Sequence, residues 1–134
     1  MLLNPICASL RRGTRYMPSE LEQTSLRDIL HHIDLVQQFT AGQDFEAFNT
    51  DTLRIYAVIR CLEVISEASR RLPDDLKARH PAIAWKEMAG AGNVYRHDYQ
   101  DVASRRVWDT VRLALPPLRT VIVAELSRST SNEP

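Results

Sequence analysis

Apolar residues recur every three or four positions along most of this chain, which is the spacing of amphipathic helices. The first such stripe runs from Ser25 to Phe39 and predicts a helix that stops before Gly42. The stripe consists of Leu26, Ile29, Leu30, Ile33 and Val36. A short bridge over residues 44–48 then leads to Asn49-Thr50-Asp51. Any of these three residues can cap the next helix by accepting a hydrogen bond from its free amides.

The second helix is predicted from about Thr52 to Leu72, with an apolar face wide enough for the centre of a bundle. That face consists of Leu53, Tyr56, Ala57, Val58, Ile59, Leu62, Ile65 and Ala68. Beside it, Arg60, Glu63 and Glu67 form a polar seam. Such a seam is usually a solvated face with weak ion pairs, and a subunit interface or the wall of a site are the alternatives.

Prolines divide the rest of the chain. Pro73 ends the second helix, and Asp74 or Asp75 is expected to cap a short helical turn that ends at His80-Pro81. The last helix is expected to begin at a cap on Asp101 and to kink near Pro116-Pro117, because proline removes a donor and clashes with the preceding turn. No segment alternates with period two, so the sequence predicts an all-α fold of four to five helices around one core.

A length of 134 residues suits one domain. Residues 1–16 carry no sustained period and are interpreted as a disordered N-terminal extension. Met17 as the natural start and a short tail packed on the surface are two further interpretations of that segment. Residues 17–127 are expected to form a single helical domain, and residues 128–134 a flexible tail.

Composition excludes some classes of protein. Seventeen basic and 17 acidic residues cancel, which argues against coating nucleic acid through bulk charge but leaves room for a local basic patch. Cys7 and Cys61 lack Cys-x-x-Cys spacing, so neither zinc nor a disulfide framework is indicated. No run approaches the roughly 18 apolar residues of a membrane span. We therefore expect a cytoplasmic protein without a metal or other cofactor.

The stretch from Trp85 to Tyr99 holds most of the candidate chemistry. Asn93 and His97 are four residues apart, so they share one face if the segment is helical, and Tyr99 adds a hydroxyl. Imidazole titrates near neutral pH, which makes His97 a candidate proton acceptor, although a lone histidine is more often structural. The adjacent pair His31-His32 cannot face one metal, because neighbours on a helix point about 100° apart.

Several motifs along residues 25–119 resemble, in order and spacing, the HepT-type HEPN-domain proteins. These are toxin halves of bacterial toxin–antitoxin pairs, encoded beside a small nucleotidyltransferase. The resemblance is carried by Asp28-Ile29-Leu30-His31-His32-Ile33-Asp34, Phe39-Thr40-Ala41-Gly42, the segment from Ala57 to Ala68, Pro81-Ala82-Ile83-Ala84-Trp85, and the segment from Asn93 to Tyr99.

This resemblance implies a HEPN-like bundle that dimerises, with two copies of the motif facing each other to form a metal-independent endoribonuclease site. The family motif is an arginine, a polar residue, three further residues, a histidine, and in this subgroup a tyrosine two positions on. Asn93, His97 and Tyr99 occupy the polar, histidine and tyrosine positions, whereas Gly92 occupies the arginine position. Losing such an electrostatic contact typically costs on the order of a hundredfold in rate.

Two interpretations of Gly92 follow. Arg96 lies four residues later, and helical side chains lean back toward the N-terminus, so its guanidinium could replace the missing one. Alternatively, the chain is an attenuated toxin.

Tyr99 has a separate role by resemblance. In similar proteins the partner nucleotidyltransferase transfers AMP to this tyrosine, which blocks the site. The alternative is a half-buried tyrosine whose hydroxyl satisfies a backbone group.

A second function, from another class, is a catalytically inactive, dimeric α-helical interaction module that binds the nucleotidyltransferase partner. Gly92 favours this interpretation, and the intact Asn93, His97 and Tyr99 favour the ribonuclease toxin. Six basic residues could add a basic rim for RNA phosphates. They are Arg70, Arg71, Lys77, Arg79, Arg105 and Arg106.

Overall fold

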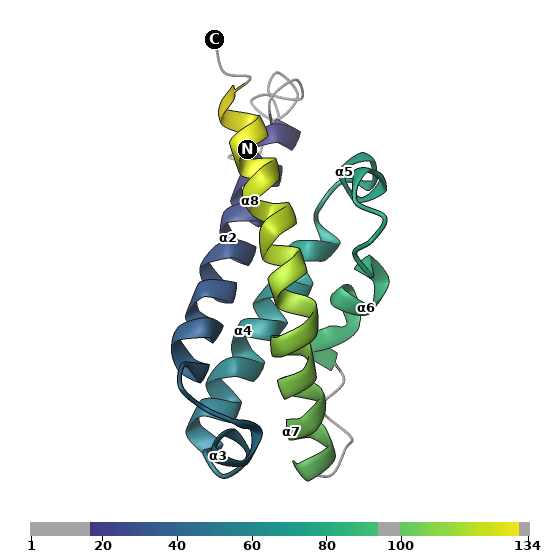
Figure 1. The fold of residues 1–134 in the computed structure, drawn as a ribbon. Helices are drawn as coiled ribbons and strands as arrows, with labels where there is room; N and C mark the ends of the chain where they lie inside the picture. Colours follow the sequence, from purple (N-terminus) through teal and green to yellow (C-terminus); the bar gives the residue numbers. More distant parts are fainter. Residues whose placement is uncertain (1–16, 94–99, 132–134) are drawn as a thin grey trace, which may run out of the picture.

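The computed structural model describes residues 17–93 and 100–131 and confirms the all-α fold, since the described residues contain helices and no strand. Three long helical rods lie side by side in Figure 1. They are α2 (Met17–Thr40), α4 (Thr52–Arg70), and α7 (Gln100–Asp109) continuing through η3 (Thr110–Ala114) into α8 (Leu115–Ser131). The shorter α5 (Asp74–Arg79) and α6 (Trp85–Gly90) stand together on one side of the bundle, and α3 (Phe45–Asn49) lies at one end.

The core follows the predicted apolar stripes. In α2, Leu26, Ile29, Ile33 and Val36 are fully buried, and α2 packs against both α4 and α8. The other fully buried large side chains come from every main helix of the bundle. They include Val58, Leu62, Ile65, Leu76, Leu115, Leu118 and Ile122. The bundle is therefore held by one continuous apolar core.

The buried face of α4 is narrower than predicted. Leu53 and Tyr56 are 82% and 69% exposed. They share the outer side of α4 with Arg60, because residues three and four apart lie on one helix face. The buried arc is narrower than the run of apolar residues suggested.

The first helix is longer than its stripe. It begins at Met17, well before the predicted start at Ser25. The apolar period could not reveal these first turns, because they are mostly polar. The bridge after it is also largely helical. Asp44 caps α3 by accepting a hydrogen bond from the Ala47 amide at 2.8 Å.

Of the three predicted caps for α4, Asp51 is the one used: its side chain accepts a hydrogen bond from the Arg54 amide at 3.1 Å. Two other predicted caps are wrong. The cap position of α5 is Pro73, which makes no side-chain hydrogen bond, so Asp74 and Asp75 stand inside its first turn. Helix α7 begins at Gln100, which places Asp101 inside the helix.

The predicted disturbance near Pro116-Pro117 takes the form of a π-helical turn, η3, immediately before the prolines. The Leu115 amide donates to the Thr110 carbonyl, five residues back. Such a wide turn interrupts the regular ladder where the prolines have no donor to contribute. The polypeptide continues as a single rod through this point and α8 extends to Ser131 (Figure 1).

Helices α5 and α6 are attached to the bundle by polar contacts as well as apolar ones. The buried carboxylate of Glu125 in α8 binds Arg79 Nη2 at 2.7 Å and His80 Nε2 at 2.8 Å. Within this segment, the Trp85 indole nitrogen at the start of α6 donates to the carbonyls of Lys77 and His80 at the end of α5, at 3.1 and 3.0 Å. These contacts fix the segment that leads into the candidate site.

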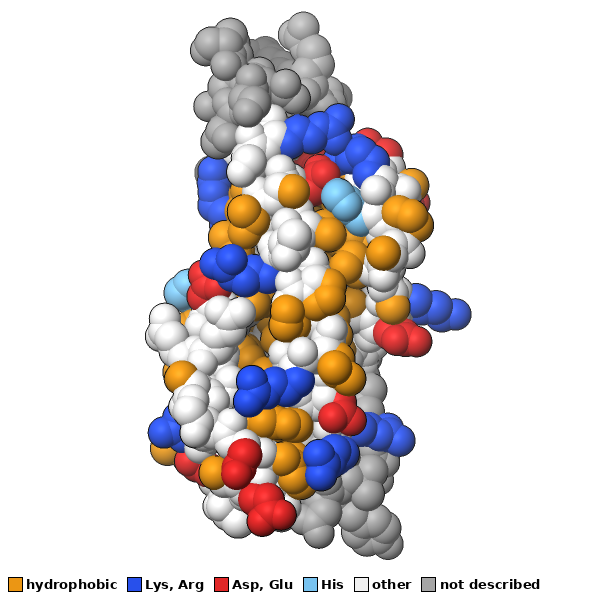
Figure 2. Space-filling model, in the orientation of Figure 1, with side chains coloured by type: hydrophobic (Ala, Val, Ile, Leu, Met, Phe, Trp, Pro, Cys, Tyr) orange, Lys and Arg blue, Asp and Glu red, His pale blue; other side chains and the backbone are white. Residues whose placement is uncertain are grey.

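The second tryptophan, Trp108, joins the opposite end of the bundle. Its ring centroid lies 5.2 Å from that of Phe48 and 6.4 Å from that of Phe45, so α3 is packed onto α7 through aromatic contacts. On the face that carries α8, apolar side chains lie along the middle and charges of both signs surround them (Figure 2). None of the helices in residues 17–93 and 100–131 is long and apolar enough to cross a membrane.

Candidate functional site

The predicted site falls partly within the described chain. Gly92 and Asn93 belong to η2 (Ala91–Asn93), a short 3-10 helix that follows α6 directly, although the side chain of Asn93 lies outside the described part. Arg96, His97 and Tyr99 lie outside the described residues. The expectation that Asn93 and His97 share a helix face therefore stays a prediction.

Gly92 is packed tightly against α4. Its buried amide donates a hydrogen bond to Ser66 Oγ at 2.9 Å. A Cβ added to Gly92 would lie 3.0 Å from Glu63 Cα and 3.3 Å from Ser66 Oγ. A contact of 3.0 Å with backbone is closer than the van der Waals separation, so any side chain at this position requires η2 or α4 to move. The position to which the resemblance assigns the motif arginine is thus a point of close approach between η2 and α4.

The polar seam on α4 borders this contact. Arg60 Nη1 binds Glu63 Oε2 at 3.1 Å, with side chains 74% and 39% exposed. Glu67 binds Arg70 at 2.6 Å and Arg71 at 3.5 Å. The seam is a row of solvated ion pairs, as its spacing predicted. In addition, Glu63 Cγ would lie 3.4 Å from a Cβ at Gly92, so this residue also walls the candidate site.

Four of the six residues of the predicted basic rim bind carboxylates or an aromatic ring of the chain itself. Arg70 and Arg71 bind Glu67, and Arg79 binds the buried Glu125. The guanidinium carbon of Arg105 lies 3.6 Å from the centre of the Phe45 ring. These four guanidinium groups therefore already have partners in the folded chain.

Glu125 was not singled out by its spacing, because it interrupts an apolar stripe and its partners lie 45 and 46 residues earlier. Burial by itself raises its pKa, but hydrogen bonds from Arg79 and His80 outweigh that effect and hold the pKa below its usual value. It remains ionised and positions the segment before α6.

The other candidates for chemistry are structural. The rings of His31 and His32 meet edge to face with centroids 5.1 Å apart, and His32 Nδ1 lies 2.7 Å from the Asp28 carbonyl oxygen. Cys61 is a free, buried cysteine, and burial raises the pKa of its thiol. Within residues 17–93 and 100–131, no three His, Cys, Asp or Glu side chains are grouped to hold a metal ion.

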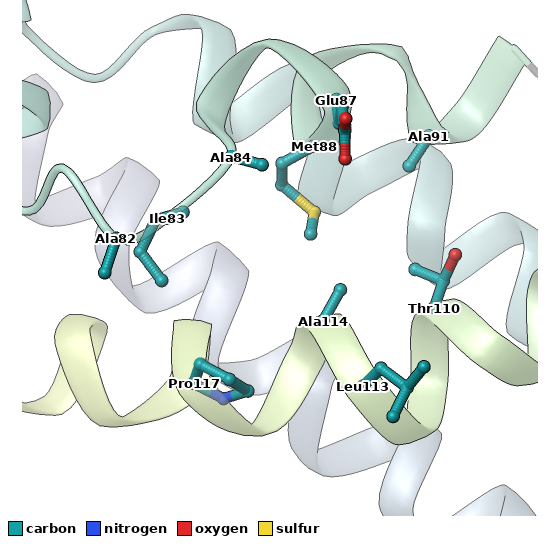
Figure 3. A pocket seen from close by; sticks show the side chains of 10 residues that line it. All are labelled: Ala82, Ile83, Ala84, Glu87, Met88, Ala91, Thr110, Leu113, Ala114 and Pro117. Atoms are coloured by element: carbon teal, nitrogen blue, oxygen red, sulfur yellow. The ribbon is translucent and has the colours of Figure 1, made fainter.

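A groove of about 270 Å³ lies between α6 with its preceding loop and the η3–α8 junction (Figure 3). Met88 projects from α6 into the space facing Ala114 and Leu113. Glu87 and Thr110 add polar groups to an otherwise apolar lining. The groove reaches Ala91, the neighbour of Gly92, but its lining is unsuited to holding a phosphate.

The amino-acid sequence is similar to those of known proteins over most of the chain. A family model described as Ribonuclease HepT-like matches residues 29–124. A protein of Thermococcus cleftensis named "Probable ribonuclease HepT" is 43% identical over 94 residues, covering 70% of this chain and 86% of that protein. A protein of Methanocaldococcus jannaschii named "Putative RNase MJ0125" is 38% identical over 103 residues, covering 77% and 89% of the two chains. No solved structure matches this chain.

Proposed function

We propose that this chain, which belongs to the ribonuclease HepT-like family, is the RNA-cleaving toxin of a toxin–antitoxin pair and acts without a metal ion. The observation that carries the proposal is the family match over residues 29–124, which spans the whole Trp85–Tyr99 stretch. The relatives named as RNases are matched over most of their length. The activity itself is our proposal for this chain.

The proposed chemistry is attack by the ribose 2′-hydroxyl on the adjacent phosphorus. His97 takes the 2′-hydroxyl proton as the new O–P bond forms. The bond to the 5′-oxygen breaks, and that oxygen takes a proton from water, which leaves a 2′,3′-cyclic phosphate and a 5′-hydroxyl. Asn93 binds a phosphate oxygen or orients the imidazole. A second copy of the chain supplies the facing motif, so the working unit is a homodimer. Arg96 is the candidate cation in place of the motif arginine, because Gly92 offers no charge.

Cleavage of a labelled RNA by purified protein, by His97→Ala and by Arg96→Ala tests this mechanism. We expect His97→Ala to lose at least a hundredfold in rate, because the proton acceptor is removed. Arg96→Ala should be similarly impaired if that guanidinium compensates for Gly92, and unchanged if it does not. A wild-type protein as inert as His97→Ala on all RNAs tried would end the ribonuclease proposal.

Gly92→Arg needs a second measurement beside activity. Restored arginine raises cleavage if the chain is an attenuated toxin, but the 3.0 Å approach of Glu63 Cα means the variant must first open the contact with α4. Its thermal unfolding should therefore be recorded with its rate. Higher activity together with lower stability is the expected pair of results.

Regulation is proposed to act at Tyr99, to which a partner nucleotidyltransferase transfers AMP. The added phosphate and nucleoside would stand two residues from His97 and exclude RNA by charge and bulk. Mass spectrometry of the Tyr99 peptide, after co-expression with a partner nucleotidyltransferase, should show one or more AMP additions. Tyr99→Phe should show none.

The second candidate is an inactive, dimeric interaction module that binds the nucleotidyltransferase. Gly92 is the observation that favours it, since tight packing against Glu63 and Ser66 has replaced the motif arginine. Stable co-purification with the nucleotidyltransferase, combined with no RNA cleavage by any variant, would support this function over the first.

A further inference from the structure

We infer that Arg60, on the outer face of α4, is a phosphate-binding residue of the RNA site. The inference rests on the proposed function and concerns a residue outside the family motif. Its starting point is the missing cation at position 92, which the structure shows to be closed to a side chain by Glu63 Cα at 3.0 Å.

The Arg60–Glu63 pair borders that position through Glu63. Glu63 Cγ would lie 3.4 Å from a Cβ on Gly92, so the Glu63 side chain occupies the space into which a longer residue at 92 would extend. The carboxylate of Glu63 in turn binds Arg60 Nη1 at 3.1 Å. The guanidinium of Arg60 is thus bound to the same glutamate, Glu63, that packs against Gly92.

The register between η2 and α4 is fixed. The Gly92 amide is hydrogen-bonded to Ser66 Oγ at 2.9 Å, and this contact is buried. Ser66 and Glu63 are three residues apart on α4, so they lie on the same side of the helix. The position of α4, and with it the backbone of Arg60, relative to Gly92 is therefore set by a buried contact.

Arg60 also retains donors for a ligand. Its side chain is 74% exposed, compared with 62% for Arg71, 55% for Arg128, and 34–44% for Arg54, Arg70, Arg79 and Arg119. Guanidinium carries five N–H donors, and Glu63 binds at one nitrogen, Nη1. The remaining fork matches the geometry of a phosphodiester, which arginine binds through paired hydrogen bonds.

Arg60→Ala tests the inference, with Arg119→Ala as the matched control. Arg119 in α8 is likewise bound to one carboxylate, that of Asp34, at 2.8 Å, and it lies 40% exposed. Binding of a fluorescein-labelled, mixed-sequence single-stranded oligoribonucleotide is measured by anisotropy in a His97→Ala background. Cleavage of the same RNA is measured in the wild-type background.

We expect Arg60→Ala to weaken RNA binding and slow cleavage at least tenfold, with the salt dependence of binding reduced by about 0.7 in log–log slope, one phosphate contact. Arg119→Ala should stay within twofold of its parent in both assays. Arg60→Lys should recover part of the binding. Circular dichroism of each variant establishes that the bundle is intact.

The two proposals fail differently. If His97→Ala cleaves as fast as wild type, the proposed catalytic site is wrong, while the binding comparison still decides the role of Arg60. If Arg60→Ala binds RNA as its parent does, or if the parent binds no RNA, the inference about Arg60 is overturned.

Discussion

Gly90 and Gly92 are two residues apart, yet their surroundings predict opposite effects of added bulk. A Cβ on Gly90 meets nothing within 4 Å, whereas one on Gly92 meets the α4 backbone at 3.0 Å. Gly92→Ala should lower the free energy of unfolding by about 1–3 kcal/mol through overpacking. Gly90→Ala should raise it by about 0.5–1 kcal/mol, because the unfolded chain loses freedom.

Urea denaturation of the two variants measures both effects on the same scale. Equal effects would show that the contact between η2 and α4 is looser than the distances indicate. By resemblance, Gly92 is predicted to occupy the arginine position of the family motif. The sequence could not show why a glycine fits there, because the contacts come from Glu63 and Ser66, which local patterns do not connect to it.

Helix termini give the predictions for individual elements. The side chain of Asp51 accepts the Arg54 amide at 3.1 Å and the Arg54 Nε at 2.8 Å, so Asp51→Ala should destabilise the protein by about 1 kcal/mol. Asp74 stands inside the first turn of α5, whose cap position makes no side-chain hydrogen bond. Asp74→Ala should therefore change stability by no more than about 0.5 kcal/mol.

Thermal melts of these two variants provide the comparison, and a larger loss for Asp74→Ala would contradict the assignment of caps. Periodicity predicted the buried stripes of α2 and α4 because burial itself selects apolar residues at that spacing. It missed the polar first turns of α2 and the short α3, where no apolar period exists. It also assigned Leu53 and Tyr56 to the buried face of α4, whereas both side chains are exposed.

At the scale of the whole molecule, Glu125 joins parts of the chain that are distant in sequence. Its side chain is 7% exposed and binds Arg79 and His80, which are 34% and 22% exposed. Glu125→Gln should lower the free energy of unfolding at pH 7 by about 1–3 kcal/mol, since it weakens a pair that is only partly desolvated. Glu87→Gln, at an exposed position, should have an effect within about 0.5 kcal/mol.

The pH dependence has a definite sign. Because the pKa of Glu125 is lowered in the folded protein, its stabilising effect is complete above the ordinary pKa of 4.5 and is lost as the pH falls through the lower folded value. The difference in stability between wild type and Glu125→Gln should therefore be present at neutral pH and shrink in acid. A gap that persists at pH 2–3 would mean that packing rather than charge is responsible.

Sequence alone predicted the all-α class and the course of the main helices, but not how α5 and α6 attach to the bundle. The polar part of that attachment is one carboxylate in α8 that binds two residues 45 and 46 positions away. The catalytic assignments of His97, Asn93 and Arg96 rest on resemblance and stay predictions.

The two tryptophans of the chain lie in two different regions, so the fluorescence of each one can report on its own region. Trp108 is buried against Phe48 in the aromatic cluster that holds α3 to α7, while Trp85 is tied through its indole nitrogen to the carbonyls of Lys77 and His80. Replacing one tryptophan at a time by phenylalanine gives two variants, and each variant keeps one tryptophan, in one of the two regions. Emission from Trp85 then reports release of the α5–α6 arm, and emission from Trp108 reports melting of the bundle, so the order of these two events can be recorded.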